Sequence, residues 1–259
     1  MATQKYICKV CGYVHEGSSA PDICPQCKAS ASEFEAMKKK GISTNSNSYT
    51  IIYSVVLVVI VAFLLAFAHS ALSEKQDDNV KLDTKKQILS ALNINNVEDP
   101  QAEFNKRIVK ILNIDGSENK PVAEFDVTGS DKYQVIYQCD IDGATKYVIP
   151  LTGNGLWGAI WGYIALDDNK SSVYGIYFNH ASETPGLGAE IVTDKFKAPF
   201  IGKNIKRNNT ITSIAVVKKG QTEDNRDCVD GISGGTITSS AVSTMLETCL
   251  KNYESFLTK

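Results

Sequence analysis

Histidine is scarce in this sequence, and charge is missing from a long internal stretch. Three of the 259 residues are histidines, and none belongs to a Glu-x-x-His pair, so a di-iron carboxylate centre of the helix-bundle kind is excluded. The 27 lysines and arginines are balanced by 29 aspartates and glutamates, which gives no basic footprint for nucleic acid. The sequence shows no dinucleotide-binding fingerprint, so we expect that the chain does not oxidise NADH unaided.

No residue between Gly41 and Ser73 carries a formal charge, and residues 51–72 are almost wholly apolar. An apolar helix of about 20 residues crosses the hydrocarbon core of a bilayer. A soluble core helix would show a polar stripe, which this run lacks. A signal peptide would stand at the extreme N-terminus, whereas a polar segment with its own cysteines precedes this run. The sequence therefore predicts one transmembrane helix over residues 51–72.

The charges on the two sides of this run differ in sign. Lys38, Lys39 and Lys40 precede it, whereas residues 74–78 are net acidic. Positive charge favours the cytoplasmic side of a membrane. We therefore expect a cytoplasmic N-terminus over residues 1–40, a polar linker over residues 41–50, and residues 73–259 on the opposite, periplasmic face.

The seven cysteines fall into two groups. Cys8-x-x-Cys11 and Cys24-x-x-Cys27 have the spacing of metal-ligand knuckles rather than of a disulfide framework. Four thiolates suit a tetrahedral soft or borderline metal, and a reducing compartment preserves such a site. The remaining three are scattered and are expected to be small buried side chains; they are Cys139, Cys228 and Cys249.

Residues around these knuckles resemble a known module. Residues 11–17 (CGYVHEG), Ala20-Pro21 and Phe34, together with the Cys-Pro-Gln-Cys knuckle, are similar to the short rubredoxin domain attached to rubrerythrins, over residues 4–36. The resemblance implies one iron held by Cys8, Cys11, Cys24 and Cys27. A structural zinc ribbon remains the alternative, because the cysteine spacing fits both metals.

The segment after the apolar run predicts an α+β domain over residues 73–259. Residues 82–92 and, more loosely, residues 104–112 have helical apolar spacing. Short β-rich runs separated by turn residues follow, at residues 133–139, 146–150, 161–166, 173–178 and 212–217. An i, i+3, i+4, i+7 stripe then predicts a C-terminal amphipathic helix, with Val242, Met245, Leu246, Cys249, Leu250, Tyr253 and Phe256 on its apolar face. Helices flanking a block of strands are typical of the α+β class.

One stretch of small residues, DGISGGTITSS at residues 230–240, leaves the hydroxyl of Thr236 open. The predicted helix begins just after it, so a phosphate on Thr236 would meet free N–H groups; a plain helix N-cap is the alternative. The stretch resembles the Asp-x-x-Ser-Gly-x-Thr acceptor motif of flavin transferases, with Ser233 and Gly234 in place and Gly235 where alanine is usual. That resemblance implies FMN bound to Thr236 as a phosphoester.

Two further segments, residues 153–158 (GNGLWG) and 180–190 (HASETPGLGAE), extend the resemblance over residues 50–259. There the chain is similar to the C subunit of the sodium-translocating NADH:quinone reductase and to the G subunit of the Rnf complex. By this similarity the flavin contacts come from Thr184, Leu187 and Gly188, with Trp157, Thr238 and Glu183 nearby. For Glu183 the alternative is a residue that simply caps a turn. We expect His180 to anchor its loop by a hydrogen bond. Lys203 and Lys206 are expected either to contact a phosphate or to be solvated. Residues 223–227 are expected to form a solvated acidic loop.

The implied function is that of an electron-carrying flavoprotein subunit of a NADH:quinone reductase that transports sodium, in a bacterial inner membrane. The partners would be the other membrane and peripheral subunits and, for maturation, a flavin transferase. No residue is assigned as catalytic, because the cofactor carries the electrons. The alternatives are a G-type subunit of an Rnf ferredoxin:NAD oxidoreductase, a stand-alone membrane-tethered flavin carrier, and a zinc-ribbon adaptor without redox chemistry. The N-terminal module is an addition that this family does not ordinarily carry, and we expect it to lie across the membrane from the flavin. It would therefore either exchange electrons with a cytosolic redox partner or have a structural role alone.

Overall fold

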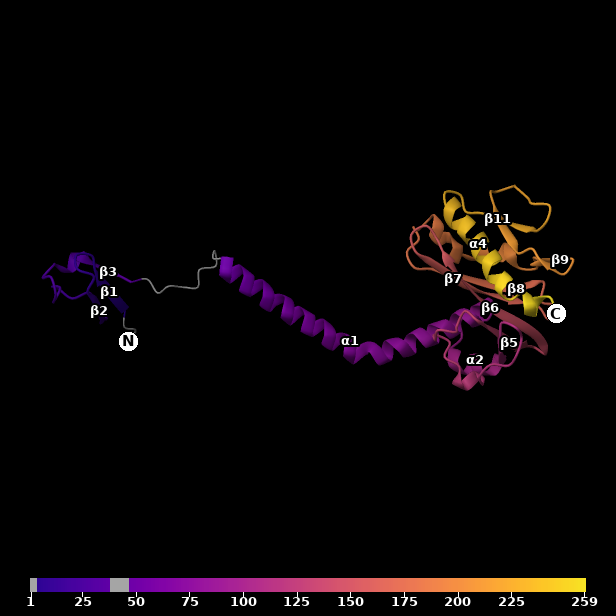
Figure 1. The fold of residues 1–259 in the computed structure, drawn as a ribbon, viewed down its shortest axis with the longest axis horizontal. Coiled ribbons are helices and arrows are strands. Elements are labelled where there is room, and N and C mark those ends of the chain that lie inside the picture. Colours follow the sequence, from indigo (N-terminus) through magenta and orange to yellow (C-terminus); the bar gives the residue numbers. More distant parts are fainter. Residues whose placement is uncertain (1–3, 38–46) are drawn as a thin grey trace. The chain divides into compact units, whose positions relative to one another are not determined.

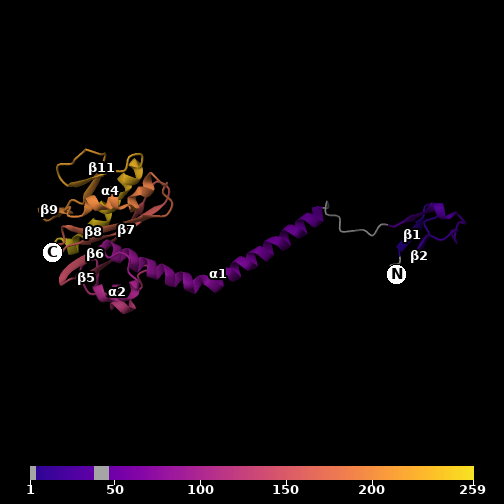
Figure 2. The same cartoon turned by 180° about the vertical axis from the view of Figure 1, so that it is seen from behind.

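The computed structural model describes residues 4–37 and 47–259 and divides the chain into two compact units, Met1–Ala71 and Leu72–Lys259. Figures 1 and 2 show the elements of each unit from opposite sides. The lysine cluster at residues 38–40 and residues 41–46 of the expected linker lie outside the described residues, whereas residues 47–50 of that linker are helical.

The N-terminal module is a small antiparallel sheet with two cysteine turns. Its strands β1 (Gln4–Cys8), β2 (Val14–Gly17) and β3 (Phe34–Ala36) have the order β2-β1-β3, and a short 3-10 helix, η1 (Ala31–Glu33), precedes β3. In the first turn the N–H of Gly12 donates to the carbonyl of Cys8 at 2.9 Å, and in the second Lys28 donates to Cys24 at 2.9 Å. Gly12 and Lys28 both have positive φ, 78° and 59°. The chain therefore makes a tight turn after the first cysteine of each knuckle.

A single helix, α1 (Asn47–Ala91, 45 residues), contains the predicted membrane-crossing run. It is the one helix among the described residues that is long and apolar enough to cross a membrane, by length and composition. The helical spacing at residues 82–92 belongs to the last turns of this same helix. There Gln87, Ile88, Leu89 and Ala91 are buried within the second unit.

The second unit is built on a five-stranded antiparallel meander in the order β4-β5-β6-β7-β8. Its strands are β4 (Ile108–Asn113), β5 (Val135–Ile141), β6 (Ala144–Asn154), β7 (Ala159–Leu166) and β8 (Val173–His180). Alternate side chains are buried on opposite faces, as strand geometry requires. Ile136 packs into the same core as the residues of α4 (Thr236–Asn252), whereas its neighbour Tyr137 packs with residues of α1 and of α2 (Pro100–Arg107).

Helices cover both faces of this sheet (Figure 1). On one face α4 buries Val242, Met245, Leu246, Cys249 and Leu250, which confirms the predicted apolar stripe for these five residues. The remaining two, Tyr253 and Phe256, lie beyond the end of α4, at its C-cap and in α5 (Glu254–Leu257), and are buried in the same core. On the other face lie the end of α1 and α2, whose start is capped by the Asp99 carboxylate, which accepts from the N–H of Ala102 at 3.0 Å.

The expected helix over residues 104–112 is wrong in its second half. Helix α2 ends at Arg107, and residues 108–113 form strand β4 with a register shift between Ile108 and Lys110. Ile108, Ile111 and Leu112 imitate helical spacing because this irregularity breaks the two-residue alternation of the strand. Three of the five residues from 108 to 112 are β-branched, which favours a strand.

Shorter elements complete the second unit. They are η2 (Val122–Glu124), η3 (Gly188–Val192), α3 (Asp194–Lys197), η4 (Ala198–Phe200), β9 (Lys206–Arg207), β10 (Thr210–Ile211), β11 (Ile214–Val217), β12 (Asp227–Asp230) and α5 (Glu254–Leu257). Strands β11 and β12 pair in parallel, and α4 follows β12 after a turn at residues 231–235. A hydrogen bond from Thr238 to Glu183 joins the start of α4 to the loop that leaves β8.

Candidate functional site

The four cysteines of the module form a cluster that fits a metal ion. Their sulfur atoms all lie within 4.8 Å of one another, with Cys8 to Cys27 at 3.7 Å and Cys11 to Cys24 at 3.6 Å. A tetrahedral ion with metal–sulfur bonds of about 2.3 Å needs sulfurs about 3.8 Å apart. Cys8 and Cys24 are buried, whereas Cys11 is exposed, so one edge of the site faces solvent.

Thr236 is the first residue of α4, and its side chain is exposed. Its hydroxyl makes no hydrogen bond to any residue in the described part of the chain. The residue before it, Gly235, supplies no capping side chain, so the first N–H groups of the helix stay free for an anion. Gly234 has φ +79°, and a Cβ there would meet the side chain of Leu187. The turn before Thr236 therefore needs glycine at position 234.

The neighbouring hydroxyls in α4 are used inside the fold. Thr238 Oγ1 donates to Glu183 Oε2 at 2.7 Å, and Ser239 Oγ accepts from the N–H of Ile232 at 3.0 Å. Both side chains are buried, 2% and 4% exposed. Of the two threonines in the first turn of α4, Thr236 is thus the one with a hydroxyl open to solvent.

Glu183 links the loop after β8 to two other segments of the site. Its carboxylate accepts from the N–H of Trp157 at 2.8 Å as well as from Thr238. Burial alone would raise the pKa of this carboxyl, but the N–H groups of Trp157 and Leu156 and the Thr238 hydroxyl outweigh burial and lower the pKa. The N–H of Glu183 donates to His180 Nδ1 at 3.2 Å, which is the loop-anchoring contact expected of His180.

Large apolar side chains are exposed on the segments around Thr236. Trp157 is 67% exposed, and Ile237, Leu156 and Leu187 are exposed by 59%, 48% and 41%. Leu187 lies beside the turn before Thr236, since a Cβ at Gly234 would meet its side chain, and exposed apolar patches on a protein often mark binding sites. Thr184 is also exposed, and its carbonyl accepts from the N–H groups of Leu187 and Ala189 at 3.1 Å, which shapes the loop.

One hollow borders Thr236, and a second adjoins the turn before it. The first, of about 340 Å³, is lined by Thr236, Ser233 and Lys218, and the second, of about 510 Å³, is lined by Lys195 and Glu190; Lys219 lines both. The sequence patterns did not single out Lys218 and Lys219. The sequence signal that could have identified them is their position directly after β11, which lies in one of the predicted β-rich runs.

The two lysines considered for a phosphate lie elsewhere. Lys206 donates to the carbonyl of Leu257 at 2.6 Å, near the C-terminus of the chain. Lys203 lines a third hollow with Cys228 and Gly220. Neither residue lines the hollow that Thr236 borders.

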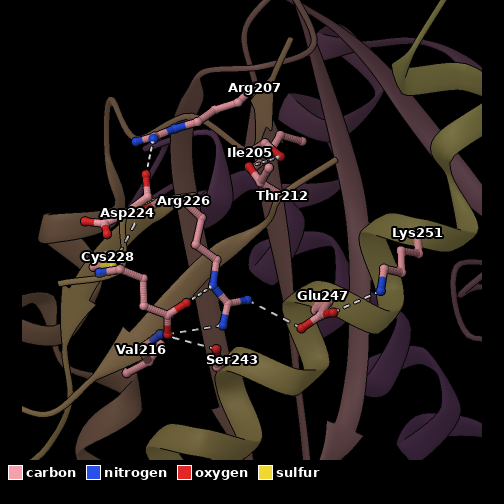
Figure 3. Close-up of polar contacts among 11 residues, drawn as sticks. Ile205, Arg207, Thr212, Val216, Asp224, Arg226, Cys228, Ser243, Glu247 and Lys251 are labelled. Carbon is pink, nitrogen blue, oxygen red and sulfur yellow. Dashed lines mark hydrogen bonds and ion pairs between the residues drawn. The ribbon is translucent and has the colours of Figure 1, made fainter. Parts of the chain in front are cut away.

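The loop that carries Lys219 is anchored to α4 by an ion pair (Figure 3). Arg226 pairs with Glu223 at 2.6 Å and with Glu247 of α4 at 3.4 Å. The N–H of Glu223 also donates to Cys228 Sγ at 3.2 Å. The acidic run expected as a solvated loop is exposed at residues 223–225, yet Arg226 ties it down and Asp227 belongs to β12.

Residues 153–158 (GNGLWG) do have the G-x-G-x-x-G letters of a dinucleotide-binding turn, which the expectation of no such fingerprint overlooked, but they do not have its structure. Strand β6 ends at Asn154 and β7 begins at Ala159, so the segment joins two antiparallel strands. A dinucleotide-binding turn instead joins a strand to a helix whose N-terminus holds the pyrophosphate.

Comparison with known proteins matches both parts of the chain. The FMN-binding domain family matches residues 155–251, and the rubrerythrin rubredoxin-like domain family matches residues 6–35. The C subunit of the Na(+)-translocating NADH-quinone reductase from Haemophilus ducreyi is 30% identical over 227 residues, 76% of this chain and 87% of that protein. The chain belongs to the C-subunit family of this reductase. The C subunit from Vibrio anguillarum is 28% identical over 229 residues, 78% of this chain and 90% of that protein.

Solved structures of this family agree with the membership. The crystal structure of the C subunit from Parabacteroides distasonis is 39% identical, with a TM-score of 0.66, and covers 73% of this chain and 98% of that one. The Shewanella oneidensis structure, 21% identical with a TM-score of 0.57 over 71% of this chain and 98% of that one, shows the shared fold. The present chain combines the FMN-binding domain of this family with a four-cysteine metal site.

Proposed function

We propose that this chain is the flavin-bearing C subunit of a Na+-translocating NADH:quinone reductase and passes electrons between redox subunits during sodium-coupled quinone reduction. The observation that carries the proposal is the open Thr236 hydroxyl at a glycine-turned helix start, within the FMN-binding domain of a member of this family. FMN supplies the electron chemistry, and the protein supplies its position and surroundings. The subunit is not catalytic alone.

FMN is held covalently on Thr236 in this proposal. A flavin transferase joins the Thr236 oxygen to the FMN phosphorus of FAD, the P–O bond of the pyrophosphate breaks, AMP leaves, and the hydroxyl proton passes to a base of the transferase. The glycines before Thr236 leave its hydroxyl accessible. The free N–H groups of α4 and the nearby Lys219 are placed to favour the phosphoester charge.

The exposed apolar side chains form the surface against which the flat flavin ring packs. Trp157, Leu187 and Ile237 offer aromatic and aliphatic area that water would otherwise cover. The loops of Ser233, Thr184 and Gly188 contribute the close backbone approach expected from the family resemblance.

The N-terminal module holds one iron through its four cysteines and passes electrons to or from a cytosolic partner, with structural zinc as the alternative. The solvent-facing edge at Cys11 supports redox contact with a partner. Stoichiometric zinc without iron in protein from its native host would leave the module a structural role only.

The chain crosses a bacterial inner membrane once, over residues 51–72, with residues 1–40 cytoplasmic, residues 41–50 as a linker and residues 73–259 periplasmic. The uncharged run within α1 and the opposite charges on its two sides support this topology. Metal and flavin then lie on opposite faces of a hydrocarbon layer of about 30 Å, so other subunits must link them. Protease added to right-side-out vesicles should digest residues 73–259 and spare an N-terminal epitope; the reverse pattern would overturn the topology.

The central experiment is co-expression of the full chain with a flavin transferase. Thr236→Val keeps the branched shape and removes the nucleophilic oxygen, so membrane insertion should survive while in-gel flavin fluorescence is lost. Thr236→Ser is the matched control, because it retains the hydroxyl. Fluorescence that persists in the valine variant would place the flavin elsewhere.

A further inference from the structure

Glu183 is buried, with 4% of its surface exposed, and it is the only Asp, Glu, Lys or Arg that is buried among residues 4–37 and 47–259. It lies in the loop between β8 and η3, in contact with the segments of the proposed flavin site. A buried charge costs free energy unless hydrogen-bond donors surround it. The presence of a carboxylate at this position therefore calls for an explanation.

Two segments converge on this carboxylate. The N–H of Trp157 donates to Oε1 at 2.8 Å, and Thr238 Oγ1 donates to Oε2 at 2.7 Å. The turn at residues 155–158 and the first turn of α4 are thus joined through one side chain. Hydrogen bonds to an ionised group are about twice as strong as neutral ones, so these contacts fix both segments.

Two glycines make room for the carboxylate. A Cβ at Gly155 would collide with Glu183 Oε1, and a Cβ at Gly188 would collide with Glu183 Oε2 and with the Thr238 hydroxyl. Both glycines belong to the loops that carry the exposed Trp157 and Leu187. The carboxylate therefore fills a cradle whose walls are the backbone of the proposed flavin site.

The hydrogen-bond donors to Glu183 are neutral dipoles, and His180 is the one titratable group that adds to their effect on its pKa, so the negative charge is compensated only in part. They lower its pKa, which leaves it ionised at neutral pH. Thr238 lies two positions beyond Thr236 in the first turn of α4, so this charge is held at the same end of the helix as the residue proposed to carry FMN. A fixed negative charge in a poorly screened site opposes the arrival of an electron nearby.

We propose that Glu183 is the positioning residue of the flavin site, which sets the turn of Trp157 against the start of α4 and lowers the reduction potential of the flavin. The inference rests on the proposed function. A purely structural carboxylate would leave the potential unchanged once the fold is intact.

The test is a redox titration at pH 8 of the full-length flavinylated chain in detergent. Glu183→Gln keeps the size of the side chain and an acceptor for the Trp157 N–H but removes the charge, so the midpoint potential should rise. Thr238→Val removes one donor and leaves the charge less compensated, so the potential should fall.

Glu103→Gln is the control variant for this titration. Its carboxylate, held by Arg107 at 2.7 Å, is on α2, on the sheet face away from α4. The potential of this variant should match that of the unaltered chain.

The outcomes separate the two levels of the proposal. Opposite shifts in the Glu183 and Thr238 variants, with none in the control, support the inference. If Glu183→Gln fails to fold or to take up flavin, the sign of the Thr238→Val shift decides, because a rise or no change overturns the inference. If the unaltered chain carries flavin and its variants have the same midpoint potential, the role of Glu183 is refuted but the proposed function is not. An unaltered chain that takes no flavin refutes the proposed function itself.

Discussion

Gly188→Ala should destabilise the second unit more than the same change at Gly186 in the same loop. Gly188 is buried, and a methyl group there would press on both the Glu183 carboxylate and the Thr238 hydroxyl. Gly186, two residues earlier, is the matched control: it has φ +76°, and a Cβ there would meet nothing within 4 Å. Comparing the two variants separates the effect of side-chain crowding at position 188 from the effect of backbone conformation at position 186.

The expected loss follows from two contributions at Gly188. Overpacking a buried site costs about 1 to 3 kcal/mol, and loss of a hydrogen bond to a charged group costs about 1.5 to 3 kcal/mol. The free energy of unfolding should therefore fall by about 2.5 to 6 kcal/mol. Gly186→Ala carries only the left-handed backbone cost of about 1 to 2 kcal/mol.

Thermal unfolding followed by tryptophan fluorescence measures this difference directly. The two tryptophans, Trp157 and Trp161, both lie in the second unit, so the signal does not report the metal module. For a unit of this size about 1 kcal/mol corresponds to about 2 to 4 °C, so Gly188→Ala should melt at least about 5 °C below the unaltered chain. Equal melting temperatures for the Gly186 and Gly188 variants would refute the crowded cradle around Glu183.

Three further predictions concern the cysteines, the buried carboxyl and the metal. Cys139 should stay unlabelled by a thiol reagent in the folded protein, because burial raises its pKa, whereas the partly exposed Cys228 should react; mass spectrometry of the labelled peptides decides. The folded-state pKa of Glu183 is lowered, so its stabilising contribution is present above the unfolded pKa of about 4.3 and is lost as pH falls through the folded value. Urea unfolding at pH 7 and below pH 4 should show a smaller pH dependence for Glu183→Gln. Removing the metal, or Cys11→Ser, should unfold the module and leave the tryptophan melting transition unchanged; a shifted transition would contradict two independent units.

Several elements could be predicted from the sequence because their signals are local. The uncharged run over residues 51–72 appears within α1, and the seven residues of the C-terminal stripe all lie in one core with the sheet. The cysteine knuckles come together as their spacing indicates, with sulfurs within 4.8 Å. In each case a short pattern carries the whole signal, and packing only completes it.

Other features depend on contacts between distant segments. Residues 108–113 form a strand despite their apparent helical spacing, because pairing with β5 outweighs that spacing. Lys206 and Lys219 look equivalent in the sequence, yet the first reaches the carbonyl of Leu257 and the second lines the hollow beside Thr236. The link of Glu183 to Thr238 spans 55 residues, so no local pattern could have revealed the buried carboxylate.

The location of the flavin tests the account most directly. Arg226 and Lys251 bound a tryptic peptide, residues 227–251, that contains Thr236 and every competing hydroxyl of the α4 start. Fragmentation of this peptide from the full chain, matured with a flavin transferase, should place one FMN less one water on Thr236. An adduct on Thr238 or Ser239 with Thr236 unmodified would show that the acceptor is misplaced, and an unmodified peptide would contradict the flavoprotein assignment.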